Sequence, residues 1–172
     1  MQHVILVNER DEEVGIMDKT RVHEEALLHR AFSVFIFNSK GEMLLQQRAK
    51  KKYHSGGLWT NACCSHPFPG ETTADAAMRR LREELGITTE LEEIFHFTYK
   101  APFDNGLTEH EFDHVLVGTY EGQIFPDRNE VDDYCFKSPD DIRTSLLTHP
   151  KKYTAWFKIA FDKVCQWHQQ NA

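Results

Sequence analysis

The segment 71-ETTADAAMRRLREELG-86 is the most informative stretch of this chain for its fold. Apolar residues recur every four positions from Ala77 to Leu85, which is typical of the buried stripe of an amphipathic helix. Gly86 stands where helices commonly end, so the spacing predicts a helix from about 73 to 85. Arginines and glutamates four positions apart share its other faces. Alone, this pattern fits a solvated helix with ion pairs as well as a helix that presents carboxylates to a metal.

Segments of strand character lie on both sides of this helix. Residues 31–37, AFSVFIF, form an almost unbroken apolar run, as expected of a strand covered on both faces. Residues 38–41 indicate a turn, 43–45 begin a partner strand, and 58–64 should return as another strand. The other predicted elements are a strand at 3–7, a charged turn at 9–13, strands at about 91–99 and 108–119, a capped helix that begins at 138–141, and a last helix with Phe157, Phe161 and Val164 on one stripe. Strands interleaved with a few helices indicate a mixed α/β (α+β) fold.

Length, charge and cysteine usage limit the classes of function. The 172 residues are 40% hydrophobic, enough for a single domain over 1–172 with a proper core. The formal net charge of −7 argues against broad binding to nucleic acid or to anionic membranes. The N-terminal apolar run is too short for a signal peptide or a membrane span, and the four cysteines show no C-x-x-C spacing. We therefore expect a cytoplasmic protein with free thiols, in which local basic residues or metal hold any anionic ligand.

A second set of residues with metal-binding chemistry lies outside the helix. The two-residue period of a strand places Glu109 and Glu111 on one face of the segment LTEHEFDHVLVG. Such neighbouring carboxylates repel each other unless a cation or a proton separates them. Three imidazoles would turn this pair into a five-ligand site for a transition metal. The candidates, each of which alone is more often an ordinary surface or core-edge residue, are His23, His29 and His66.

The helix segment resembles the later part of the Nudix box, in which helix carboxylates hold a divalent cation over a diphosphate. An acidic residue at 71, Arg79 and the run 83–86 (Glu-Glu-x-Gly) carry this resemblance. Mg²⁺ suits such a site because it binds few carboxylates and takes substrate oxygens as its remaining ligands. Two positions depart from the hydrolytic members, which have Gly in place of Ser65 and Glu in place of Arg80. The loss of that carboxylate favours a protein that grips a diphosphate without cleaving it.

Four segments together resemble the hallmark segments of type I isopentenyl-diphosphate isomerases. They are LLHRAFSVFIF, GLWTNACCSHP, RRLREELG and TEHEFDHVL, and the resemblance extends from about residue 3 to 160 in the family's order and nearly its spacing. It implies a Nudix fold, with a mixed β-sheet core sandwiched by helices. It also implies an isomerase of isoprenoid biosynthesis, which interconverts isopentenyl diphosphate and dimethylallyl diphosphate by protonating and deprotonating the alkene.

The same resemblance implies the site residues by position. Five side chains would ligate a catalytic Mn²⁺ or Zn²⁺: His23, His29, His66, Glu109 and Glu111. Four basic residues would clasp the diphosphate: Lys19, Arg48, Lys52 and Arg80. Glu84 matches the ligand of a Mg²⁺ that accompanies the diphosphate.

The resemblance also implies the groups that perform the chemistry. Cys64 aligns with the family's catalytic cysteine, and it would share proton transfer with Glu111, to which Tyr99 would donate a hydrogen bond. Trp156 aligns with a pocket tryptophan, whose indole face would stabilise a carbocation by ~2 kcal/mol when water is excluded. Without the family match, packing of the last helix would be the preferred explanation of Trp156. The remaining cysteines are interpreted as small hydrophobes: Cys63, Cys135 and Cys165.

Two other classes of function stay open at this point. A Nudix diphosphohydrolase acting on a nucleotide would release phosphate, and Arg80 speaks against it. A metal-stabilised binding domain without catalysis would keep its function after Cys64→Ala or Glu111→Gln. The expected partner is a small prenyl diphosphate, with neither nucleic acid nor a membrane involved, while the oligomeric state and the choice between Mn²⁺ and Zn²⁺ stay open.

Overall fold

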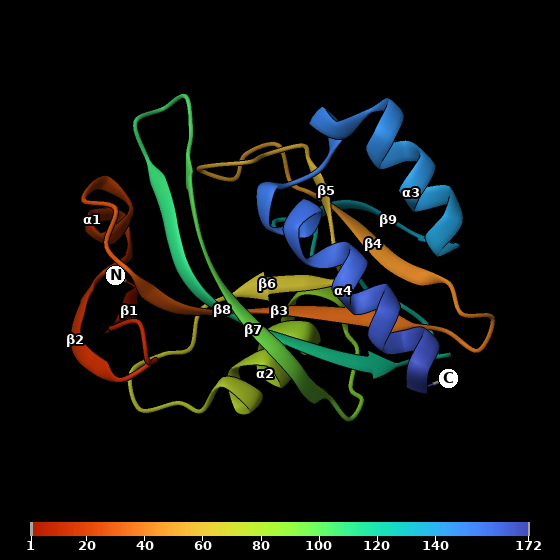
Figure 1. The fold of residues 1–172 in the computed structure, drawn as a ribbon, viewed down its shortest axis with the longest axis horizontal. Coiled ribbons are helices and arrows are strands. Elements are labelled where there is room, and N and C mark those ends of the chain that lie inside the picture. The colour runs from red at the N-terminus through yellow and green to blue at the C-terminus, as the bar shows by residue number, and fades with distance from the viewer. Residues whose placement is uncertain (1, 172) are drawn as a thin grey trace.

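The computed structural model describes residues 2–171, which form a nine-stranded mixed sheet with helices on both faces (Figure 1). The strands are β1 (His3–Val7), β2 (Glu13–Asp18), β3 (His29–Phe37), β4 (Met43–Arg48), β5 (Trp59–Thr60), β6 (Cys63–Ser65), β7 (Glu92–Pro102), β8 (Thr108–Thr119) and β9 (Val131–Lys137). The helices are α1 (Lys19–Glu24), α2 (Thr73–Leu85), α3 (Pro139–Thr148), the 3₁₀ turn η1 (Pro150–Lys152) and α4 (Ala155–Asn171). The predicted mixed α/β (α+β) class is confirmed.

The centre of the sheet is a parallel pair, β3 and β8, which runs in register from His29 opposite Glu111 to Phe37 opposite Thr119. The long strand β7 pairs antiparallel with the other edge of β8. On its opposite edge, β3 pairs with β1 at its start and with β6 through residues 32–34. After the turn that follows β3, strand β4 diverges and pairs with β5 and β9. The starts of β3 and β8 and the end of β6 therefore meet at one place in the sheet.

The apolar run of β3 serves two hydrophobic cores, one on each face of the sheet. Phe32 and Ile36 point toward α2, where they pack in a cluster with Leu81. Phe35 and Phe37 point the other way and pack against α3 and α4. All four side chains are fully buried, and burying each contributes roughly 1.5–3 kcal/mol. The predicted strand with both faces covered is confirmed.

Helix α2 has the bounds that its pattern predicts. Thr72 caps its start, with Oγ1 accepting a hydrogen bond from the Asp75 amide at 3.1 Å. Gly86 ends it with a φ of 68°, in the left-handed region that a residue with a side chain rarely adopts. Arg79 reaches back to Glu71 with two hydrogen bonds of 2.8 and 2.9 Å. The loop before α2 is thereby fixed to the helix, and the helix lies against β3.

The C-terminal helices also agree with their predictions. Ser138 caps α3, its Oγ accepting a hydrogen bond from the Asp141 amide at 3.2 Å. Phe157, Phe161 and Val164 are all buried on the inner face of α4. Among residues 2–171, no helix is long and apolar enough to cross a membrane.

The expected strand at 58–64 is wrong as a single strand, because the structure divides it into β5 and β6. The buried amide of Asn61 lies at the break and donates to the carbonyl oxygens of Val34 and Cys63 at 2.9 and 3.0 Å. These bonds satisfy the backbone where the chain leaves β4 and joins β3. The sequence pattern of residues 58–64 indicates a buried strand, but it does not show that the two halves of this segment pair with different strands.

Strands β2 and β9 and the short helix α1 have no counterpart among the predicted elements. The turn at 9–13 is present, but β2 already begins at Glu13 and continues through Gly15. Val14 and Ile16 of β2 are 63% and 51% exposed, so this edge strand lacks the buried alternation by which strands are recognised.

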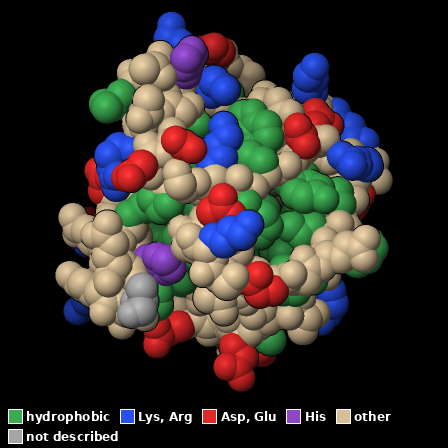
Figure 2. All heavy atoms as spheres, turned by 90° about the vertical axis from the view of Figure 1, so that its right-hand side faces the viewer, with side chains coloured by type: hydrophobic (Ala, Val, Ile, Leu, Met, Phe, Trp, Pro, Cys, Tyr) green, Lys and Arg blue, Asp and Glu red, His purple; other side chains and the backbone are tan. Residues whose placement is uncertain are grey.

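Figure 2 shows basic and acidic side chains interspersed around hydrophobic ones on the face at the right of Figure 1, with no continuous basic surface among the described residues on that face.

Candidate active site and metal centre

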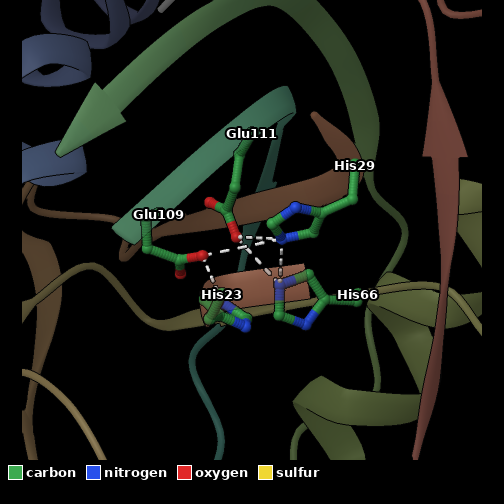
Figure 3. Close-up of side chains that lie close together, drawn as sticks. All are labelled: His23, His29, His66, Glu109 and Glu111. Carbon is green, nitrogen blue, oxygen red and sulfur yellow. Dashed lines mark hydrogen bonds and ion pairs between the residues drawn. The ribbon is translucent and has the colours of Figure 1, made fainter. Parts of the chain in front are cut away.

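Three histidines and two glutamates converge where β3, β6 and β8 meet (Figure 3). They come from α1, the start of β3, the residue after β6 and the start of β8: His23, His29, His66, Glu109 and Glu111. One nitrogen or oxygen of each lies within 4.8 Å of those of the others, and all five residues are buried. The strand period puts the glutamates on one face of β8, and the register of β3 and β8 sets His29 opposite Glu111. The structure thus brings together the five residues expected to ligate a metal.

The hydrogen bonds behind this cluster point imidazole lone pairs into it. His23 and His29 donate from Nδ1 to the carbonyl oxygens of Lys19 and Leu27 at 2.7 and 2.9 Å. With Nδ1 as the donor, the neutral form of each ring would present Nε2 as its metal-binding nitrogen. His29 Nε2 lies 3.2 Å from His66 Nε2, so two ring nitrogens face each other across a buried space. Such an arrangement is stable only with a cation or a proton between the donors, and the N and O donors fit a divalent metal.

The carboxylates complete this donor set. His29 Nε2 lies 3.5 Å from Glu109 Oε1 and 3.4 Å from Glu111 Oε2, and His66 Nε2 lies 2.8 Å from Glu111 Oε2. Burial opposes charge on His29, yet hydrogen bonds to the two glutamates raise its pKa to about 10. Burial lowers the pKa of His66 to about 4, against the pull of Glu111. In the metal-free protein, protons take the place of a cation at this centre, so metal binding must displace them.

Cys64 lies on β6 beside this cluster and contacts an indole. Its Sγ–H donates to Asn61 Oδ1 at 3.1 Å and lies 3.6 Å from Ser33 Oγ, while Trp156 donates from Nε1 to Sγ at 2.9 Å. Burial, together with the nearby carboxylate of Asp113, raises the pKa of the Cys64 thiol to about 12. The thiol therefore holds its proton at neutral pH, which makes Cys64 an acid in this resting state.

Glu111 also has a donor on the side away from the histidines. Tyr99 OH donates to Glu111 Oε1 at 2.5 Å, while Glu111 Oε2 faces His66 and His29. Burial and the charge of Glu111 raise the pKa of Tyr99 well above its ordinary value, so the phenol remains a donor. The two oxygens of Glu111 therefore have different surroundings, one in the cluster and one bonded to a phenol.

A cavity of about 420 Å³ opens beside these groups. Cys64, Glu111 and Trp156 all line it, together with the four basic residues expected to bind the diphosphate: Lys19, Arg48, Lys52 and Arg80. Among the described residues, no group lies within hydrogen-bonding distance of the buried Nε atoms of Arg48 and Arg80. Buried guanidinium donors without a partner are costly. An anionic ligand in the cavity would offer them acceptors.

Comparisons with known proteins show the family of this chain. The NUDIX domain model matches residues 27–157. "Isopentenyl-diphosphate Delta-isomerase" of Pectobacterium atrosepticum is 47% identical over 171 residues, covering 98% of this chain and 94% of that protein. The protein of the same name from Serratia proteamaculans is 48% identical over 154 residues, covering 90% and 86%. This chain belongs to the isopentenyl-diphosphate Delta-isomerase family.

Solved structures share the fold of this chain. DR0079 from Deinococcus radiodurans aligns with a TM-score of 0.71 and 23% identity, covering 86% of this chain and 90% of that one. The MutT protein from Methanosarcina mazei aligns with a TM-score of 0.66 and 21% identity, covering 79% and 91%. At these identities the likeness concerns the fold alone. Together with the NUDIX domain match, it confirms the predicted Nudix architecture.

Glu84, the expected Mg²⁺ ligand in this isomerase family, does not line the cavity in the described structure. Its carboxylate is buried, which raises its pKa, and it accepts a hydrogen bond from Cys63 Sγ at 2.8 Å. Arg80 Nη2 lies 3.5 Å from Glu84 and 3.5 Å from Glu130, and Lys52 also pairs with Glu130. Glu84 therefore sits directly behind a basic residue of the cavity wall.

The sequence interpretation missed several residues that surround the site. Tyr53 and His54 line the cavity from the loop between β4 and β5, and Glu130 lines it from the position just before the unpredicted strand β9. Asp113 and Ser33 lie behind Cys64, where Ser33 Oγ donates to Asp113 Oδ2 at 2.9 Å. The strand period that singled out the glutamates also includes Asp113, so the same signal could have revealed it. The loop residues had no comparable signal.

Proposed function

We propose that this chain, as one Nudix-type isomerase domain, interconverts isopentenyl diphosphate and dimethylallyl diphosphate. The support is a single juxtaposition: a protonated thiol, a carboxylate and an indole line one cavity together with basic residues. Relatives that are nearly half identical over most of the chain carry the name of this activity. A cavity of about 420 Å³ is within the usual range for a small-molecule site.

The reaction requires an acid and a base, because an isolated alkene has no carbonyl group to acidify a neighbouring proton. We assign these tasks to Cys64 and Glu111. Protonation at one carbon gives a tertiary carbocation, and loss of a proton from the adjacent carbon gives the other isomer. The order in which the two groups act reverses with the direction of the reaction. Each well-placed proton transfer contributes about 10²–10⁴-fold to the rate.

Two neighbours hold these groups in place. Tyr99 donates to Glu111 Oε1 at 2.5 Å, which fixes the orientation of that carboxylate. Trp156 donates to Cys64 Sγ at 2.9 Å, so its indole ring lies next to the group that would deliver the proton. The indole face would stabilise the carbocation by about 2 kcal/mol when water is excluded. The Arg48 guanidinium lies 5.4 Å from the centre of the same ring. It would therefore bind the diphosphate close to the indole that stabilises the carbocation.

The donors that converge in Figure 3 fit a divalent metal, and we infer Mn²⁺ or Zn²⁺ there. Its positive charge would keep both carboxylates deprotonated at neutral pH. For the diphosphate we infer Lys19, Arg48, Lys52 and Arg80 as ligands. Glu84 would bind an accompanying Mg²⁺ once Arg80, which lies between Glu84 and the cavity, turns toward the diphosphate. Charge-assisted hydrogen bonds of this kind contribute about 1.5–3 kcal/mol each.

The test starts from each isomer separately, with purified protein, Mg²⁺ and Mn²⁺, and follows the mixture by ¹H and ³¹P NMR. An isomerase gives the same final ratio of the two diphosphates from both starting points and releases no phosphate. Release of inorganic phosphate or diphosphate would instead indicate a hydrolase. Unchanged substrate in both directions would contradict the proposal.

A further inference from the structure

A fourth histidine, His54, lies against the metal centre without being one of its five converging donors. It comes from the loop between β4 and β5, and its side chain is only 4% exposed. His54 Nε2 lies 3.3 Å from Glu109 Oε2. The other oxygen, Glu109 Oε1, contacts His23 and lies 3.5 Å from His29 Nε2. Figure 3 shows these two oxygens diverging, one toward the histidines and one away from them.

The neighbours of His54 determine which of its nitrogens carries the proton. Glu109 Oε2 can only accept, so the proton of the neutral ring sits on Nε2, which faces it. Nδ1 lies 3.2 Å from Ser55 Oγ, whose hydroxyl can donate to an unprotonated ring nitrogen and so fits the same tautomer. A nitrogen that carries a proton cannot bind a metal, so His54 acts on the centre through the carboxylate.

Aromatic contacts fix the ring of His54 on two sides. It stacks on Phe103 with ring centroids 4.7 Å apart and an interplanar angle of 7°, and it meets Trp156 edge-on at 6.1 Å. Phe103 lies at the tip of the β7–β8 hairpin, where Asn105 Nδ2 also donates to the Tyr53 carbonyl at 2.8 Å. The hairpin tip and the β4–β5 loop thus hold the imidazole in the orientation that its hydrogen bond requires.

We propose that His54 is a positioning residue of the metal centre, which donates to Glu109 Oε2 and so leaves Oε1 as the oxygen that faces the metal. The inference presupposes the metal site of the proposed function. Partners of this kind orient metal-ligating side chains, and their removal costs about 10–100-fold in metal affinity. A histidine that merely fills space in the loop would have no such effect when another ring replaces it.

The experiment measures Mn²⁺ affinity without substrate, by the EPR signal of free Mn²⁺ in titrations of the chelator-treated full chain. H54F keeps a ring for stacking and loses the donor, whereas H54Q keeps an N–H near the position of Nε2 and loses the ring. H149F, at an exposed histidine on the C-terminal cap of α3, is the matched control. We expect about 10–100-fold weaker binding for H54F. The Mn²⁺ affinity of H54Q should stay much closer to that of the wild type, and the affinity of H149F should equal the wild-type value.

Two results would overturn the role of His54: wild-type affinity in H54F, or equal losses in H54F and H54Q, which would assign the effect to packing. If H54F does not fold, H54M replaces it, because methionine fills a similar volume and has no N–H donor. H54M should then bind Mn²⁺ more weakly than H54Q, and equal affinity of the two variants would overturn the proposal. A wild-type chain that binds no Mn²⁺ would overturn the metal centre itself, which separates the two failures.

Discussion

Tyr99→Phe removes one hydroxyl and leaves the surrounding packing in place. The Tyr99 hydroxyl donates to Glu111 Oε1 at 2.5 Å, and both residues are buried, at 6% relative exposure each. His66 and His29 contact the other carboxylate oxygen, Oε2. These two described neighbours therefore do not replace the hydrogen bond that Oε1 loses. A hydrogen bond to a charged group contributes about 1.5–3 kcal/mol. At roughly 2–4 °C per kcal/mol for a chain of this length, the melting temperature should fall by about 3–12 °C.

The same substitution should slow turnover, because Glu111 loses the contact that orients it toward the cavity. If the full 1.5–3 kcal/mol is lost in the transition state, kcat/KM falls by roughly 10–150-fold. Thermal unfolding and the isomerisation rate would both be measured, with Tyr134→Phe as the control, since Tyr134 lies on β9 away from the cavity. A Tyr99→Phe protein with the melting temperature and kcat/KM of the wild type would refute the role given to this bond.

Three further predictions follow from the same contacts. Cys64→Ala should lower kcat by about 10²–10⁴-fold in a kinetic assay while circular dichroism stays unchanged; near-normal turnover would exclude the cysteine as a proton-transfer group. A chelator should abolish activity and lower the melting temperature, and indifference to chelators would contradict the metal centre. In metal-free protein, the pairing of His29 with Glu109 and Glu111 contributes its full stabilisation of the folded state below about pH 6.5. This stabilisation is lost as the pH rises through about 10, the raised pKa of His29. Urea unfolding should therefore give a falling free energy of unfolding over this window, and a rising one would contradict the assignment.

Local patterns were sufficient where one element carries its own signal. The stripe from Ala77 to Leu85 and the glycine after it gave the bounds of α2, because helix periodicity and the C-cap are properties of neighbouring residues. The two-residue period likewise placed Glu109 and Glu111 on one face of β8. The unbroken run of β3 revealed a strand between two cores.

The sequence pattern could not predict which residues from different elements come together in the folded protein. His23, His29 and His66 come from three elements, and only the pairing of β3 with β6 and β8 brings them together. The family resemblance supplied that grouping, whereas spacing alone did not. His54 lies in a basic loop beside glycines, where no periodicity exists, and its burial depends on the tip of a distant hairpin. Edge strand β2 was missed because its apolar residues face solvent.

Isotope exchange during turnover tests the central claim most directly. Isopentenyl diphosphate would be incubated with the protein, Mg²⁺ and Mn²⁺ in D₂O, and the products followed by NMR. Proton addition and removal by Cys64 and Glu111 predicts dimethylallyl diphosphate that carries deuterium and no free phosphate. Cys64→Ala and Glu111→Gln should form this labelled product about 10²–10⁴-fold more slowly. Dimethylallyl diphosphate without deuterium, or the same labelled product from both variants at the wild-type rate, would contradict the claim.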